Sequence, residues 1–550
     1  MHIDARSIHS DDVISADLCI AGAGVAGVTL AREFTRSGVS VLLLESGGIH
    51  PDRQMQGLLW GENVGHAYYP LDNARSCGFG GSAHKWLIDL PENQLGARIH
   101  PLEEIDFKER SWVPHSGWPF DRTHLNPYYR RAQALCRSGP YSYQAADWEE
   151  GGVNPCLEMD PNRVATTIFH FTDRRTFVSH YLDEIKGSDT VRLLTHATLL
   201  EMETSSNPRE ISALHIGTPA GNRFRVRARQ YVLSLGAIEC ARTLLLSQTE
   251  GRSAIGNQHD LVGRYFMEHP HLWSGRWIPS ANLDLRRLGL YRLHAMKGTP
   301  IMGKLITTET VQREGKLLNY CVSVHPLVKR YTHDIVPVWP IDNWPLLKPD
   351  GHRTDSAAPS QTPLKTPSKP LKTALMEQVK EAGRHLMGGM LQRHRPKVVH
   401  FTLNHMAEQA PNPDSRVVLS NEADFLGRRR VRLDWRLTAL DIQSIITSQE
   451  IVDAELRRIG AGGLKIDYDT RRVKQKIQGG WHHMGTTRMH ADPRRGVVDP
   501  NSKVHDTANL YIAGPSVFPT SGYANPVLTI VALAIRLADH LKGVLRSSSE

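Results

Sequence analysis

Residues Gly22–Gly27 (GAGVAG) decide the fold of this chain. They join an apolar run, residues 17–21 (DLCIA), to a segment with a helical pattern, residues 25–37. In a GxGxxG turn of this kind the first glycine allows a tight turn, the second lets the backbone approach a pyrophosphate, and the third lets helix and strand pack closely. The start of the helix then offers unpaired N–H groups and the positive end of its dipole to phosphate oxygens.

A second apolar run, Val39–Leu44 (VSVLLL), follows this helix and ends at Glu45, eighteen residues after Gly27. Two buried strands on either side of a helix make a βαβ unit. An acid at the end of the second strand accepts hydrogen bonds from ribose hydroxyls, and it repels a 2′-phosphate, so NADP is disfavoured. The unit predicts a dinucleotide site rather than an ordinary glycine-rich turn, but it does not distinguish NAD from FAD.

The composition is that of a soluble globular protein with a large core. The chain has 550 residues, of which 40% are hydrophobic and 22% charged, and its mean hydropathy is −0.37. The net charge of +9 comes from scattered Lys and Arg rather than a basic stripe with interleaved aromatic residues, so nucleic-acid binding is not expected. The polar N-terminal residues lack an apolar signal core, and no run of eighteen apolar residues occurs. We therefore expect a cytoplasmic protein without a membrane span.

The six cysteines form no CxxC pair. Cys19 and Cys240 lie inside apolar runs, which is typical of buried core thiols. Neither a zinc site nor a disulfide framework is expected.

The rest of the chain alternates between patterned and irregular segments. Residues 57–150 lack clear periodicity, and residues 341–372, rich in Pro, Ser, Thr and Lys, are interpreted as a mobile insertion or lid. Strands are predicted at residues 191–200, 223–235, 397–408, 430–437 and 509–513, and helices at residues 238–247, 438–458 and 526–541. Thr438 and Asp441 frame a capping box for the second of these helices, and Asn412–Asp414 (NPD) marks a turn.

The residues best suited to catalysis lie in the last seventy residues, in Trp481–Met489 (WHHMGTTRM) and Gly522–Thr529 (GYANPVLT). A histidine suits the removal of a hydroxyl proton because its pKa lies near neutrality. An asparagine amide can donate a hydrogen bond to an oxygen without competing as a base. Since the chain has 28 histidines, His482 taken alone is more simply a surface or hydrogen-bonded residue.

In combination these stretches resemble the glucose–methanol–choline (GMC) oxidoreductase family. The matching elements are Gly22–Gly27 with Glu45, Gly80–Ser82 (GGS), Leu233–Leu245 (LSLGAIECARTLL), Trp481–Met489 and Asn525–Thr529 (NPVLT). Weaker similarity lies at Gly263–His269 (GRYFMEH) and Glu408–Ser420 (EQAPNPDSRVVLS). The closest likeness is to bacterial sugar and polyol dehydrogenases and to pyranose-oxidase-like members.

The resemblance implies an α/β fold in two parts. A discontinuous Rossmann-like FAD-binding domain covers residues 1–270 and 480–550, and a substrate-binding α+β domain with an antiparallel sheet, including 397–408 and 430–437, covers residues 271–479. His482, three residues before the Gly of the H-x-x-G-T element, is the implied catalytic base, with His483 a neighbour that shapes the site or faces away. Asn525 is the implied second catalytic residue. The implied FAD-binding residues are Gly22, Gly24, Val25, Ala26, Gly27, Glu45, Ser46, Gly80, Gly81, Ser82, His84, Lys85, Leu199, Leu235, Gly236, Gly514, Pro526 and Val527.

One departure concerns how FAD is held. Pyranose-oxidase-like relatives carry GG-x-x-x-H-W, and in some of them that His is covalently bound to flavin. Here Lys85 directly precedes Trp86, and His84 is one place earlier. The resemblance therefore favours non-covalent FAD, and Lys85 would place a cation near the flavin.

The implied activity is the oxidation of a CH–OH group to a carbonyl, with His482 as base and hydride transfer to flavin N5. The expected substrate is a sugar, polyol or glycoside. A hydrophobic alcohol such as a sterol or terpenol is the alternative within the family, and an NAD-dependent Rossmann dehydrogenase or a flavin-fold binding protein is the alternative outside it. The electron acceptor is expected to be quinone-like or O₂, and the sequence does not separate a dehydrogenase from an oxidase.

Overall fold

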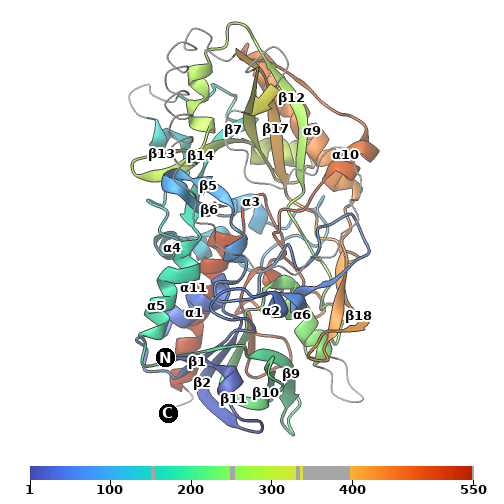
Figure 1. Cartoon of the computed structure of the whole chain (residues 1–550). Helices are drawn as coiled ribbons and strands as arrows, with labels where there is room; N and C mark the ends of the chain where they lie inside the picture. The colour runs from blue at the N-terminus through green and yellow to red at the C-terminus, as the bar shows by residue number, and fades with distance from the viewer. Residues whose placement is uncertain (150–154, 248–253, 330–334, 338–396, 548–550) are drawn as a thin grey trace, which may run out of the picture.

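The computed structural model describes residues 1–149, 155–247, 254–329, 335–337 and 397–547. In Figure 1 a sheet with mostly parallel strands lies at the bottom, beside both termini, and a larger antiparallel sheet lies at the top. The mixed α/β fold expected from the sequence is confirmed. The predicted insertion at residues 341–372 lies outside the described residues.

The lower sheet, which we call the nucleotide sheet, has the strand order β1-β8-β3-β2-β11-β10-β9, and β21 pairs with β11. The pairs from β1 to β11, and the β11–β21 pair, are parallel. The strands are β1 (His2–Asp4), β2 (Val13–Ala21), β3 (Val41–Leu44), β8 (Val191–Thr195), β9 (Thr198–Thr204), β10 (Ile211–Gly217), β11 (Arg223–Leu233) and β21 (Leu510–Ile512). All four residues of β3 are buried, as expected where helices cover both faces of a parallel sheet.

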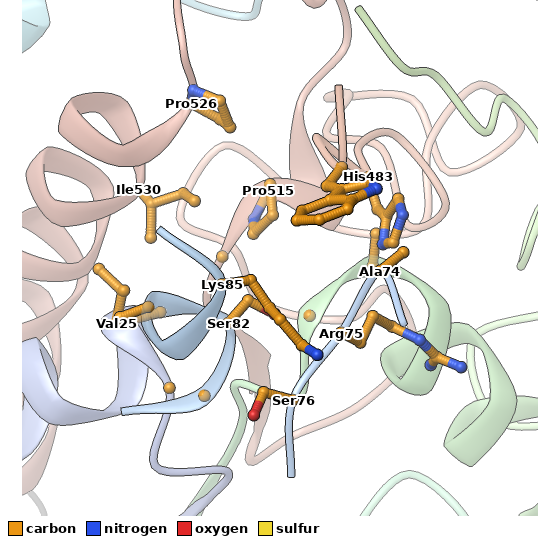
Figure 2. A pocket seen from close by; sticks show the side chains of 18 of the residues that line it. Val25, Ala74, Arg75, Ser76, Ser82, Lys85, His483, Pro515, Pro526 and Ile530 are labelled. Atoms are coloured by element: carbon orange, nitrogen blue, oxygen red, sulfur yellow. The ribbon is translucent and has the colours of Figure 1, made fainter. Parts of the chain in front are cut away.

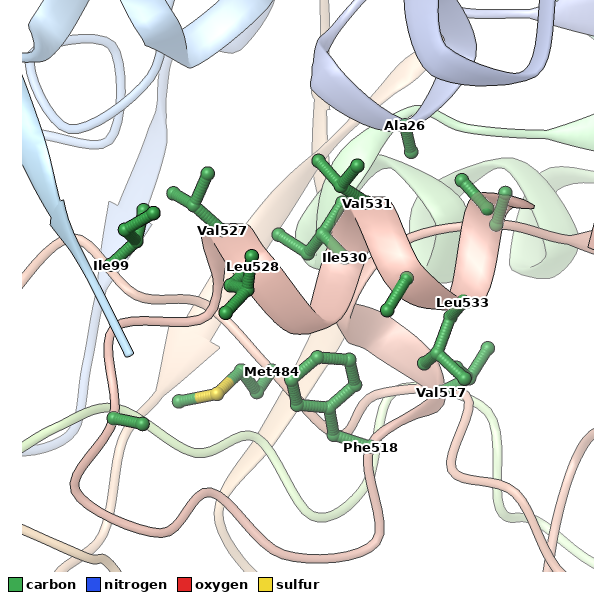
Figure 3. Packing of buried hydrophobic residues seen from close by; sticks show 14 of the residues in the cluster. Ala26, Ile99, Met484, Val517, Phe518, Val527, Leu528, Ile530, Val531 and Leu533 are labelled. Carbon is green, nitrogen blue, oxygen red and sulfur yellow. The ribbon is translucent and has the colours of Figure 1, made fainter. Parts of the chain in front are cut away.

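Three helices stack beside this sheet and bring the two halves of the chain together. α11 (Val527–Ser547) packs against α1 (Val25–Glu33) and α4 (Arg122–Leu135). Figure 3 shows Val531 of α11 next to Ala26 of α1, with Met484 and Phe518 on the opposite side of α11. Because all four of these side chains are buried, α11 joins the glycine-rich turn to the segment that carries His482.

The larger sheet, which we call the substrate sheet, has the order β20-β12-β17-β15-β14-β7-β6-β5. Its strands are β5 (Ile88–Leu90), β6 (Gln94–Ile99), β7 (Val164–Asp173), β12 (His271–Pro279), β14 (Thr299–Thr307), β15 (Tyr320–Lys329), β17 (Lys397–Ala407) and β20 (Gly462–Lys465), with β13 (His294–Met296) and β16 (Ile335–Pro337) at its margins. α9 (Ala439–Arg458) begins at a capping box in which Thr438 and Asp441 bond each other's backbone N–H groups, as predicted.

The remaining elements are short. A small sheet contains β18 (Arg416–Ala423), β19 (Arg429–Asp434) and β4 (Gly61–Asn63). The other helices are α2 (Arg53–Gln56), α3 (Glu104–Phe107), α5 (Tyr181–Lys186), α6 (Gly236–Leu246), α7 (Glu309–Gly315) and α10 (Thr470–Lys476).

Residues 191–200 are strands as expected, but they belong to two of them, because His196 has a left-handed φ of 56° and turns the chain between β8 and β9. Two other expectations about these elements were wrong. Strands β17 and β19 do not share a sheet, since β19 pairs with β18 and β4. Residues 57–150 also contain the fourteen-residue helix α4, whose pattern is obscured by Pro127 and by many polar side chains.

Candidate active site

One cavity at the carboxyl end of β2 gathers side chains from both ends of the chain, where doubly wound sheets bind ligands. It is lined by residues 22, 24–26, 45–46, 58–59, 74–77, 81–83, 85–88, 96–98, 234–237, 239, 480–483, 513–515, 525–527 and 530, among others. Figure 2 shows Val25 of α1, Ser82 and Lys85 around this cavity, with Pro526 and Ile530 from the start of α11.

Most of the residues expected to bind FAD line this cavity. They are Gly22, Gly24, Val25, Ala26, Glu45, Ser46, Gly81, Ser82, Lys85, Leu199, Leu235, Gly236, Gly514, Pro526 and Val527. Gly27, Gly80 and His84 are not among the lining residues. A Cβ on Gly27 would lie 1.9 Å from the Gly22 carbonyl oxygen, and the amide of Gly80 donates to the carbonyl of Ala23 at 2.8 Å. Both glycines therefore support the backbone of the glycine-rich turn without lining the cavity.

At three glycines the backbone faces the cavity with no side chain in between. A pyrophosphate group needs such close access to the backbone. A Cβ built on Gly236 meets no described atom within 4 Å, and one on Gly24 meets only the Gly81 Cα at 4.0 Å. At Gly514 the nearest described atom is the Ala26 Cβ at 3.9 Å. Because side chains at these positions would enter the cavity, the three glycines form a cradle that fits the phosphates of a dinucleotide.

Glu45 closes the ribose end of the cavity. Its carboxylate accepts hydrogen bonds from the backbone N–H groups of Ala23 at 3.0 Å and Gly47 at 2.9 Å. Burial raises the pKa of this carboxyl group, while the backbone donors act in the opposite direction. These bonds fix the carboxylate where β3 ends, the position expected for a group that holds ribose hydroxyls.

A buried group of charges lies at the same end of the cavity and was not predicted from the sequence. Arg75 and Arg242 both donate to Glu239, at 2.7 and 3.2 Å, and Arg428 donates to the carbonyl oxygen of Leu199 at 3.1 Å. The neighbouring arginines hold the pKa of Glu239 down to about 2 against the effect of burial. Because Leu199 is one of the residues expected to bind FAD, Arg428 holds the strand that carries it at the cavity wall.

The two residues expected to be catalytic meet at the other end of the cavity. Nδ2 of Asn525 lies 3.0 Å from Nε2 of His482, and both residues line the cavity. His482 is half-buried and Asn525 is 5% exposed. Among the described residues, Oδ1 of Asn525 is buried without a hydrogen-bond partner. The ring nitrogen and the amide are therefore placed to contact one oxygen atom of a substrate.

The surroundings of His482 keep its imidazole neutral. Its pKa is lowered well below the ordinary value, first by burial and then by His269 and His271, which repel a positive charge on His482 when they are themselves protonated. A neutral imidazole carries one unprotonated nitrogen, and this nitrogen can accept a proton.

His483 is bound on a different side. Its Nε2 lies 2.8 Å from the hydroxyl of Tyr68, which also bonds Glu268. The ring is 8% exposed, and burial lowers its pKa to about 3. His483 therefore lines the cavity beside His482, while its ring nitrogen is held in a buried cluster with Tyr68 and Glu268.

Sequence reasoning also missed cavity residues on the substrate sheet. His271 begins β12 and Arg98 lies on β6, and both line the cavity. Neither residue belongs to a recognisable motif. His271 follows the weakly matching stretch Gly263–His269, and Arg98 lies in a segment without periodicity. Only the folding of β6 and β12 against Gly480–His483 brings them to the site.

Together, the fold and the cavity are those of a dinucleotide-binding protein that has a histidine and an asparagine side by side at the wall of its cleft. The comparisons with known proteins narrow this class. Residues 411–534 match the family model of the C-terminal part of GMC oxidoreductases. This part of the chain is similar to GMC oxidoreductases, and the oxidases and dehydrogenases among its relatives support an FAD-dependent alcohol oxidoreductase.

The relatives of this chain match it over very different shares of its length. The fructose dehydrogenase large subunit of Gluconobacter japonicus is 23% identical and aligns over 98% of this chain and 99% of its own length. Paromamine 6′-oxidase of Streptomyces fradiae is 32% identical, but that match covers 29% of this chain and 28% of the relative. Among solved structures, pyridoxine 4-oxidase from Mesorbium loti has a TM-score of 0.54 at 15% identity, over 96% of this chain and 99% of its own. This last likeness bears on the fold alone.

Within the part of the chain that the structure describes, no helix combines the length and the apolar character needed to cross a membrane.

Proposed function

We propose that this protein oxidises a CH–OH group of a sugar, polyol or glycoside to a carbonyl, with His482 as the base. The observation that carries the proposal is the 3.0 Å contact between Asn525 Nδ2 and His482 Nε2 at the wall of the cofactor cavity. A substrate hydroxyl placed there would give its proton to the ring nitrogen, and the asparagine amide would hold the same oxygen. FAD, when bound, supplies the acceptor for the hydride that leaves the carbon.

Non-covalent binding of FAD is part of the proposal. The ring of His84 is turned to the backbone, and its Nε2 lies 2.8 Å from the carbonyl oxygen of Phe79. Lys85, by contrast, lines the cavity (Figure 2). If FAD is held without a covalent bond, acid precipitation should release the yellow colour into the supernatant, whereas flavin retained on the polypeptide would contradict the proposal.

The polar face of the substrate sheet supports a polyhydroxylated substrate. Trp273 lies two residues after His271 on β12 and is the direct register partner of Asn404 on β17, so all three side chains are on one face of the sheet. Of the three, His271 lines the cavity. Ser323 pairs with Asn404 on the next strand, and the Trp273 ring lies 4.9 Å from that of His325. Hydrogen-bonding groups beside an indole ring suit a sugar better than a sterol, and one relative is a fructose dehydrogenase.

We also propose the two-domain division of residues 1–270 with 480–550, and 271–479. The pairing of β21 with β11 supports it. Strands β5, β6 and β7, however, extend the substrate sheet although they precede residue 270, and β18 and β19 pair with β4. The chain therefore crosses between the two parts more often than the division implies. The cytoplasmic location remains a prediction.

The test is anaerobic mixing of the FAD-loaded protein with a panel of alcohols, followed by readmission of air. Sugars, polyols and glycosides should bleach the flavin absorbance, and hydrophobic alcohols of equal concentration should not. Bleaching by sterols or terpenols alone would overturn the substrate class, and no bleaching by any alcohol would overturn the activity. Recovery of the colour in air, or only after a quinone is added, identifies the electron acceptor.

A further inference from the structure

Both ring nitrogens of His482 have partners. Nε2 faces Asn525 at 3.0 Å, and Nδ1 lies 2.9 Å from Nδ1 of His269. Two histidine nitrogens at this distance share one proton, so one of them donates and the other accepts. Which nitrogen donates decides whether Nε2 of His482 can act as a base.

The far side of His269 settles the direction of this bond. Its Nε2 lies 3.2 Å from the carbonyl oxygen of Ser521. A carbonyl oxygen only accepts hydrogen bonds, so Nε2 of His269 carries a proton. The His269 ring is fully buried, and burial lowers its pKa to about 4. The ring is therefore neutral at neutral pH, and its Nδ1 is left with a lone pair.

It follows that Nδ1 of His482 donates to His269. Because His482 is also neutral, its second nitrogen, Nε2, has the lone pair, and the amide N–H of Asn525 points at it. The chain of donors and acceptors is consistent from Ser521 through both histidines to Asn525. This arrangement places the lone pair on Nε2 of His482, the ring nitrogen that faces Asn525 at the cavity wall.

Glu268, the residue before His269, holds the backbone of His482. Oε2 of Glu268 accepts from the backbone N–H groups of Gly480 at 2.9 Å and His482 at 3.0 Å. Between these two lies Trp481, whose φ of 61° is in the left-handed region. A non-glycine residue there is strained and persists only where its surroundings enforce it. Glu268 thus fixes the main chain of His482 while His269 contacts its side chain.

We propose that His269 is the positioning residue that sets the tautomer of His482, so that Nε2 is the unprotonated nitrogen and the imidazolium formed by proton uptake is stabilised at Nδ1. This rests on the proposed role of His482 as base. His269 is not itself a catalytic residue, because it does not line the cavity.

The stabilisation matters because burial and nearby cationic groups oppose a positive charge on His482. Burial lowers its pKa most, and His269, His271, His483 and Arg98 lower it further; the His271 ring is 6.0 Å away. His269 opposes the charge only when it is itself protonated, and in its neutral form it offers a lone pair instead. After proton uptake at Nε2, the Nδ1–H bond to His269 becomes a bond from a charged donor. Such bonds contribute about 1.5–3 kcal/mol, which is about 10- to 100-fold in rate.

The experiment compares His269→Asn with His269→Leu. The two side chains have nearly the same shape, but asparagine places a carbonyl oxygen near the position of Nδ1 and leucine has no acceptor. Both lose the bond to Ser521. With FAD content matched, anaerobic stopped-flow reduction of the flavin by a substrate should be about 10- to 100-fold slower in His269→Leu than in the wild type, and His269→Asn should recover most of that loss.

Equal losses in the two variants, or a wild-type rate in His269→Leu, would overturn the inference. If His269→Leu does not fold, His269→Gln replaces it, because glutamine reaches the Nε2 position and leaves Nδ1 without a counterpart. A Gln variant as fast as the Asn variant would then overturn the inference. His482→Ala in the same assay separates the two proposals: normal reduction there overturns the role of His482, whereas slow reduction there with fast His269→Leu overturns only the role of His269.

Discussion

The two ends of the cavity are built in different ways. The framework of the nucleotide end comes from one continuous stretch, in which β2, the glycine turn, α1 and β3 follow each other up to Glu45; Gly236, Gly514 and the charged residues around Glu239 join this framework from other segments. The catalytic end is assembled from Glu268–His271, Gly480–His483 and Asn525, three segments that are distant in sequence. The first end should therefore depend on local backbone shape, and the second on hydrogen bonds between segments. This difference predicts that substitutions can remove the cofactor or the chemistry separately.

The largest effect is expected at the nucleotide end, from Gly24→Val. Gly24 has an ordinary φ of −76°, and its Cβ would point into open cavity. The protein should therefore fold while the valine occupies the space of the pyrophosphate, lowering FAD affinity about tenfold or more. The measurement is FAD content from the flavin absorbance, with the melting temperature without FAD as a check on folding.

Gly543→Val is the matched control, because a Cβ at Gly543 also meets no described atom within 4 Å but lies away from the cavity, on α11. Full FAD content in Gly24→Val would show that the cradle is not where the phosphates bind.

The second effect is expected at the catalytic end, from His482→Ala. A general base contributes about 10² to 10⁴ in rate, so flavin reduction should slow by that factor. FAD should stay bound, because the glycine cradle and Glu45 are untouched. Anaerobic stopped-flow reduction measures this step without reoxidation. Near-normal reduction with full FAD loading would disprove the role of His482 as base.

Asn525→Ala should follow, with a loss of about 10² in the reduction rate, which is typical when one hydrogen-bond donor to a reacting oxygen is removed. Because Asn525 precedes α11, the reduction potential of the flavin should shift as well. Asn525→His is the control, since it retains an N–H donor. If both variants react equally slowly, the amide acts through packing rather than through its hydrogen bond.

The smallest effect on rate is expected from His483→Ala. Its ring bonds Tyr68 and faces Glu268 in a buried cluster, so its loss should lower the free energy of unfolding by about 1–3 kcal/mol. Flavin reduction should change by less than it does in His482→Ala. Thermal unfolding and stopped-flow reduction of the same sample test both statements. A larger rate loss than in His482→Ala would mean that the base is misassigned.

The nucleotide end could be predicted from sequence because each of its steps is local. The spacing from Gly22 to Glu45 specifies strand, turn, helix and strand, and all four are present. The position of His482 was predicted from the family resemblance rather than from physics, since one histidine among 28 carries little information. His269 ends the weakly matching stretch Gly263–His269, but that match assigned it no role, because its role depends on the Ser521 carbonyl, which is 252 residues away in sequence.

The errors in the fold have the same origin. Alternation along residues 397–408 and 430–437 identifies strands but not their partners, and the partner of β19 is β4, which has only three residues. Likewise, a left-handed residue such as His196 divides a continuous apolar run without any glycine or proline to mark the break.

The placement of β21 and α11 has a consequence for how the protein matures. β2 and α1 leave the ribosome first, but β21 adds to the nucleotide sheet and α11 covers α1 only after about 500 more residues have been made. Until then the apolar surface around Ala26, which meets Val531 in the folded protein (Figure 3), stays exposed. We therefore expect FAD to load late in biogenesis, and nascent chains that stop short of α11 should be substrates for chaperones rather than flavoproteins.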